Sequence, residues 1–216
     1  MTTTSSAILA QGTRLGIAGT PAAPVSITGV TKSKPAVATG TNTLAVGDTL
    51  VFGAIVGMPE LLNRLCIVSA SNGTTFTVNV DSTNFAAVGT TGAATPQTFV
   101  DVNNVHDYSG FDGVSSEIDI TNLQSLAKEY APGLEDYGQF TMNIDVDNTD
   151  PGQIAMRAAK SSQLRTYFRL IMRNASVRVF YGFVKKQGEA AAVDGVVKAA
   201  VDIRISGRPS FSEIVN

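Results

Sequence analysis

Strict alternation of apolar and polar residues in two segments is the feature that most constrains the fold. Residues 139–147 read QFTMNIDVD, with Phe140, Met142, Ile144 and Val146 on one side and polar residues on the other. Residues 196–206 read VVKAAVDIRIS and alternate in the same way from Val197 to Ile205. Because successive side chains of a strand point to opposite faces, both segments predict strands with one buried face. This pattern is typical of an antiparallel sheet.

Two longer apolar segments, 165–173 and 176–186, are further strand candidates joined through Asn174-Ala175. One helix is expected beside these strands, over residues 151–161. Asp150 is a good N-cap, Pro151 suits the first helical position, and Gln153 would complete a capping box. The apolar stripe of this helix would consist of Ile154, Ala155, Ala158 and Ala159.

Residues 24–95 differ in composition from the rest of the chain. They are rich in Gly, Thr, Ala and Val, and their few charges cancel. Short strand candidates at 35–39, 49–52, 65–69 and 75–80 lie between turn signals, and Asn72-Gly73 predicts a hairpin turn. The segment is interpreted as an inserted small β-barrel decoration module, 24–95. The main domain then comprises residues 1–23 and 96–216, and the fold class is mainly β with one flanking α-helix.

Residues that could carry chemistry are few, and each has a structural explanation. His106 and Asp107 are sequence neighbours, which point to opposite faces of a strand and so do not form half of a triad. Cys66 lies in an apolar run and is interpreted as a core residue. The segment DVDNTDPG, Asp145 onwards, lacks the Gly and Glu of a calcium loop. We therefore expect no enzyme activity, no cofactor and no metal site.

Bulk composition narrows the possible partners. The net charge of -2 argues against a basic nucleic-acid-binding surface, and no stretch is long and apolar enough to cross a membrane. Charged residues make up only 16% of the chain, below the roughly 25% of an average soluble domain. A surface with so few charges is typical of a protein covered by partners, although a β-rich fold alone also explains it.

Three stretches, in order along the chain, resemble the major tail tube proteins of long-tailed bacteriophages. They are GTRLGI, EIDITNLQSLAKEYAPGLEDYGQFTMNIDVDNTDPGQ and VDIRISGRPSF. The resemblance implies a sandwich or barrel-like β-fold that assembles as homohexameric rings, stacked into the tube through which DNA passes non-specifically at ejection. It also implies location in the virion tail, with assembly in the host cytoplasm. The implied partners are further copies of the chain and other tail proteins, such as the tape measure and tail terminator.

Residues 24–95 have a resemblance of their own. GVTKSKPAVAT, GDTLVFGAIVGMPELLNRLCIVSASNGTTFTV and VDSTNF are similar to a small β-module of phage structural proteins, described by its likeness to a domain of the ubiquitin-activating enzyme. No ubiquitin chemistry follows from this. On a tail tube, such a module would be an external decoration, and surface insertions generally tolerate removal.

Residues 121–138 are the candidate assembly surface, because they hold more apolar side chains than a free loop needs. A weak helical pattern covers 121–130 and ends at Pro132-Gly133, but a structured loop fits equally well. The expected subunit interface comprises Leu123, Leu126, Tyr130, Leu134, Glu135, Asp136, Tyr137, Arg165 and Arg169. Alternatively, the loop covers the bottom of the sheet within one subunit.

A β-sandwich adhesin or fibre-type binding module is the alternative function. The scarcity of aromatic residues, 7% with no Trp, argues against a carbohydrate platform. Electron microscopy of concentrated protein separates the two functions, because only the tail protein would form rings or tubes.

Overall fold

The structure is a computed structural model that describes residues 7–212, so the expected ends of the main domain, 1–6 and 213–216, lie outside the described residues. Eight strands form the main sheet, in which all neighbouring strands are antiparallel. Their order is β10 (Val105–Gly110), β13 (Gln139–Asp145), β16 (Lys198–Ile205), β15 (Val177–Ala190), β14 (Thr166–Ile171), β1 (Arg14–Ala18) and β9 (Phe99–Val102), with β17 (Ser210–Ser212) paired to β15. The sheet curls into a nearly closed, barrel-like form. The mainly β class with a single helix is therefore confirmed.

The predicted alternation places the core of this sheet. Phe140, Met142 and Ile144 of β13 are buried, and Met142 pairs with Val201 of β16. Aromatic rings fill the centre, where Phe140 and Phe180 have centroids 5.2 Å apart. Val197, expected on the buried face of the second alternating segment, is instead 40% exposed because it precedes β16.

Helix α1 (Pro151–Ser162) begins as predicted, with the Asp150 carboxylate accepting from the Gln153 backbone N–H at 2.7 Å. The capping box is wrong. The Gln153 side chain turns into the protein, where its amide donates to the carbonyl oxygens of Asn103 and Asp145. The predicted stripe is also partly wrong, since the buried face consists of Gly152, Gln153 and Met156, whereas Ile154 is 47% exposed.

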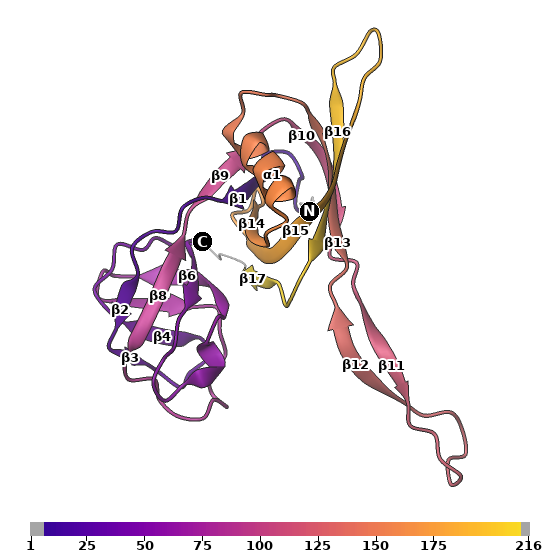
Figure 1. The fold of residues 1–216 in the computed structure, drawn as a ribbon. Coiled ribbons are helices and arrows are strands. Elements are labelled where there is room, and N and C mark those ends of the chain that lie inside the picture. The colour runs from indigo at the N-terminus through magenta and orange to yellow at the C-terminus, as the bar shows by residue number, and fades with distance from the viewer. Residues whose placement is uncertain (1–6, 213–216) are drawn as a thin grey trace, which may run out of the picture.

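A second sheet of seven strands occupies residues 25–97 (Figure 1). Its order is β2 (Val25–Ile27), β8 (Gly92–Gln97), β5 (Thr49–Phe52), β6 (Leu65–Ser71), β7 (Thr75–Val78), β4 (Ala36–Thr39) and β3 (Gly29–Val30), with a 3-10 helix, η1 (Pro59–Leu61), after β5. It has its own core of buried residues, which includes Phe52, Phe76 and Cys66. We therefore propose that residues 24–95 form a separate module, named here the inserted module, whose last strand β8 runs two residues past the expected boundary.

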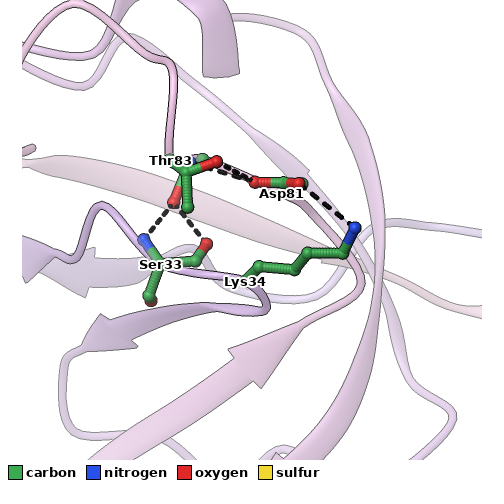
Figure 2. A network of polar contacts seen from close by, with 5 residues as sticks. Ser33, Lys34, Asp81 and Thr83 are labelled. Carbon is green, nitrogen blue, oxygen red and sulfur yellow. Dashed lines mark hydrogen bonds and ion pairs between the residues drawn. The ribbon is translucent and has the colours of Figure 1, made fainter.

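Side-chain contacts fix one irregular loop of this module. Asp81 accepts from the backbone N–H and the hydroxyl of Thr83 and pairs with Lys34 at 3.4 Å (Figure 2). The buried Ser82 hydroxyl accepts from the Ser33 backbone N–H at 3.0 Å. These contacts join the segment before β4 to the segment after β7.

The inserted module also packs against the main sheet. Ile67 of β6 forms a small buried cluster with Val177 and Val179 of β15, surrounded by Leu65, Phe99 and Ile171. The Asn79 side chain donates to the Ser210 hydroxyl and to the Phe211 carbonyl oxygen of β17. The two sheets are thus in contact as well as joined through the chain.

A separate two-stranded ribbon, β11 (Val114–Asp119) and β12 (Tyr130–Asp136), extends away from both sheets (Figure 1). Residues 120–129 form its tip and contain no helix, so the alternative of a structured loop is confirmed. Pro132-Gly133, expected to end a helix, lies inside β12. In the described part of the chain, no helix has the length and apolar character needed to span a membrane.

Candidate functional site: the assembly arm

The ribbon of residues 114–136, called the assembly arm below, presents its apolar side chains to solvent. Leu123 and Leu126 at the tip are fully exposed, and Leu134 of β12 is 90% exposed. Val114 and Ile118 of β11 are also exposed. Exposed apolar side chains gathered on one projecting element are typical of interaction surfaces, so the arm stays the candidate interface. An isolated two-stranded ribbon is also only marginally stable in water, so a partner would stabilise it.

The root of the arm is held rigidly by the core. The Phe111 ring packs edge-on against Phe180 and Phe211, with centroids 5.4 Å away in each case. Gly113 lets the two segments at the root approach each other closely, since a Cβ there would lie 1.8 Å from the Asp136 carbonyl oxygen. Gly138 adopts a φ of 70°, which favours glycine. The arm therefore projects from a fixed base.

An ion pair further fixes the root. Asp136 pairs with Arg204 of β16 in the same chain. Its carboxylate also accepts from the Gly138 backbone N–H at 2.9 Å. Together the Gly138 N–H and the Arg204 guanidinium lower the pKa of Asp136, so the pair stays charged through the neutral range.

Polar contacts shape the tip. The Thr121 hydroxyl accepts from the Glu129 backbone N–H at 3.0 Å and so closes the ribbon. Asn122 caps a turn by accepting from the Gln124 N–H, and Asp119 accepts from the Thr121 N–H. These bonds satisfy the backbone locally and leave the tip leucines pointing outward.

The structure separates the nine expected interface residues into three groups. Leu123, Leu126, Tyr130 and Leu134 lie exposed on the arm. Glu135, Asp136 and Tyr137 belong to its root, where the Tyr137 hydroxyl donates to Glu135 at 2.6 Å and raises the pKa of the phenol. Because the Tyr137 ring also packs on the main core, it is only partly available to a partner.

The third group comprises the two arginines at β14. Arg165 is exposed just before the strand. The Arg169 guanidinium lies 4.4 Å from the centroid of the Phe99 ring, and burial lowers its pKa. Pairing of the arm carboxylates with Arg165 or Arg169 of a neighbouring copy stays a prediction. Within the chain, Asp136 already pairs with Arg204, a contact that the sequence did not reveal.

The remaining candidates for chemistry each have structural partners. His106 Nε2 lies 2.7 Å from the Asp145 carboxylate, while Asp107 accepts from the Asn143 side chain at 2.8 Å. Cys66 is buried, and burial raises the pKa of its thiol to about 12, so the predicted core position is confirmed. In residues 7–212, no group of three or more His, Cys, Asp or Glu side chains converges as metal ligands would.

Comparison with known proteins connects this arm to one family. Residues 77–178 match the sequence model of the family described as phage tail tube, TTP, lambda-like. The matched segment contains the whole arm, α1 and β14, and spans slightly under half of the chain. This family is structural and not enzymatic. The match begins within β7 and is to a tail tube family only, so the resemblance of residues 24–95 to a known small β-module stays a prediction.

Two solved structures have similar chains. One is the tail of an empty GTA particle refined with C6 symmetry: 14% identity, TM-score 0.45, 53% of this chain and 86% of that chain covered. The other is the six-fold symmetrised baseplate of the anti-feeding prophage: 7% identity, TM-score 0.41, 54% of this chain and 85% of that chain covered. No curated protein matches the chain.

Proposed function

We propose that this protein is the structural subunit of a phage tail tube, which assembles as hexameric rings stacked into a conduit for DNA. The observation that carries the proposal is the match of residues 77–178 to a tail tube family. The match includes the assembly arm, whose exposed apolar side chains project from a base fixed by the core. Neighbouring copies, and other tail proteins at the ends of the tube, are the partners this surface fits.

The low charge of the chain suits a conduit. Every cation that neutralises a phosphate adds to DNA affinity through counterion release, so a basic lumen would retain the DNA that must pass. The net charge of -2 avoids this retention. A binding protein for DNA would need the opposite balance.

The test is assembly of purified protein at rising concentration, followed by sedimentation and electron microscopy. We expect rings of six copies and tubes made of stacked rings. The double variant Leu123→Asp, Leu126→Asp should remain folded and lose both, because the substituted side chains are fully exposed within the subunit.

A matched control is Val56→Asp, Val88→Asp, which changes two exposed valines of the inserted module. This control should assemble as the original protein does. Dispersed monomers at every concentration, with tail components added as nuclei, would contradict the proposed function.

A further inference from the structure

A groove of about 890 Å³ lies where the inserted module meets the main sheet. Arg64 and Leu65 line it from the module, and Tyr167, Tyr181, Arg208 and Phe211 line it from the main domain. The volume lies within the range of sites that hold several side chains or a small ligand. No single sheet forms this groove, because its walls exist only while the two sheets are in contact.

Aromatic rings and two arginines, Arg64 and Arg208, give the groove most of its chemistry, and Glu135 adds one carboxylate at the base of the arm. The rings of Tyr167 and Tyr181 have centroids 4.7 Å apart and present an apolar wall. Arg64 lies over the Phe85 ring at 5.4 Å, and neither Arg64 nor Arg208 forms an ion pair with any residue in 7–212. Since the two arginines outnumber the Glu135 carboxylate, a fitting partner would combine apolar side chains with carboxylates.

The assembly arm has this complementary chemistry. Residues 114–136 contain five carboxylates and one lysine, Lys128. At the tip, Asp119 and Glu129 flank the exposed Leu123 and Leu126. Hydrogen bonds from Thr121 lower the pKa of Asp119, which keeps it negative.

The arm cannot reach the groove of its own chain. Glu135 and Tyr137, at the root of the arm, line the groove, so the groove lies beside the base of the ribbon. The tip lies beyond the paired strands β11 and β12, about 20 Å away at roughly 3.3 Å per residue. Figure 1 shows the ribbon extending away from both sheets. Only the tip of a second copy can occupy the groove without dismantling β11 and β12.

We infer that the arm tip of one copy docks in the module–sheet groove of another copy. Leu123 and Leu126 then pack on Tyr167 and Tyr181, and the flanking carboxylates face Arg64 and Arg208. The contact is heterologous, so repetition closes a ring or extends a filament. This inference rests on the proposed function and adds the acceptor site, which makes the inserted module part of the assembly interface.

Cross-linking between differently tagged chains tests the contact directly. One chain carries Leu126→Cys in the arm and the other carries Arg208→Cys in the groove, and the mixture is treated with a short bismaleimide. Native Cys66 is buried, and its high thiol pKa keeps it unreactive near neutral pH. We expect a product that joins the two tags. Replacing Arg208→Cys by Val56→Cys, an exposed module position outside the groove, should yield none.

Charge reversal provides a second measurement. Arg64→Glu with Arg208→Glu should raise the concentration needed for assembly by roughly tenfold or more, because like charges then face each other across the contact. Adding Asp119→Arg and Glu129→Arg should restore assembly, which a merely structural role of the arginines would not produce. Tubes that form normally without the mixed cross-link would overturn this inference and leave the proposed function intact. Absence of any assembly in the unmodified protein would overturn both.

Discussion

Replacing Ile67 by Ala should loosen the inserted module from the main sheet. Ile67 follows Cys66 and precedes Val68 in β6, and both neighbours point into the module core. Ile67 therefore points outward, yet it is 0% exposed because Val177 and Val179 of β15 cover it. Its burial is therefore due to the contact between the two sheets.

The cost of the substitution follows from the atoms removed. Ile to Ala deletes three carbons, worth about 0.8 kcal/mol each in transfer free energy. The residual cavity adds to this. We therefore expect the packing of the module against the main sheet to be weakened by about 3 kcal/mol, within the roughly 2–5 kcal/mol typical of such changes. This loss is a large fraction of a net stability of about 5–15 kcal/mol.

Urea unfolding followed by circular dichroism and by limited proteolysis measures the effect. In the unmodified chain the two sheets should unfold in one transition. In Ile67→Ala they should unfold in two transitions, and the segments that join the module to the main sheet should be cleaved by protease first. Val68→Ala is the matched control, since it weakens the module core without touching the junction. A loss below about 0.5 kcal/mol for Ile67→Ala, the range of ordinary surface changes, would refute the reasoning.

Three further outcomes follow from single contacts. Asp150→Ala should destabilise the protein by about 1–2 kcal/mol through loss of the α1 cap, measured by thermal unfolding. Because burial raises the Cys66 pKa to about 12 in the folded state, the contribution of this thiol to stability should be constant below pH 9 and fall as pH rises towards 12; Cys66→Ala should make the loss of stability over that range less steep. His106→Ala should assemble normally, since its contact with Asp145 lies apart from the arm, and a sedimentation profile that differs from the original would contradict this.

Segments with one buried and one polar face were predictable because their periodicity comes directly from packing. Residues 139–147 matched β13 in this way, and the N-cap at Asp150 followed from local hydrogen bonding. Val197 was predicted wrongly because it lies just before β16 begins, outside the paired part of the sheet. Alternation predicts burial only where a partner layer exists.

The false helix at residues 121–130 has a similar cause. Leu123, Leu126 and Tyr130 have helical spacing, but a helix this short needs a packing partner within the chain, and the arm provides none. Thr121 and Asn122 instead bond to nearby backbone groups, which competes with helix formation. The spacing of the leucines reflects exposure at a turn, and the sequence has no signal that distinguishes the two cases.

The junction, in contrast, left a signal that the sequence interpretation did not use. Residues 65–68 read LCIV, apolar at both parities, which is typical of a strand covered on both faces. A free decoration would keep its outer face polar, as the alternating strands of the main sheet do. Removing the module would expose Val177 and Val179, which are almost fully buried, and would remove Arg64 and Leu65 from the groove. We therefore propose that the module is one wall of the assembly interface and not a removable attachment, and we expect its deletion to impair the main sheet and assembly together.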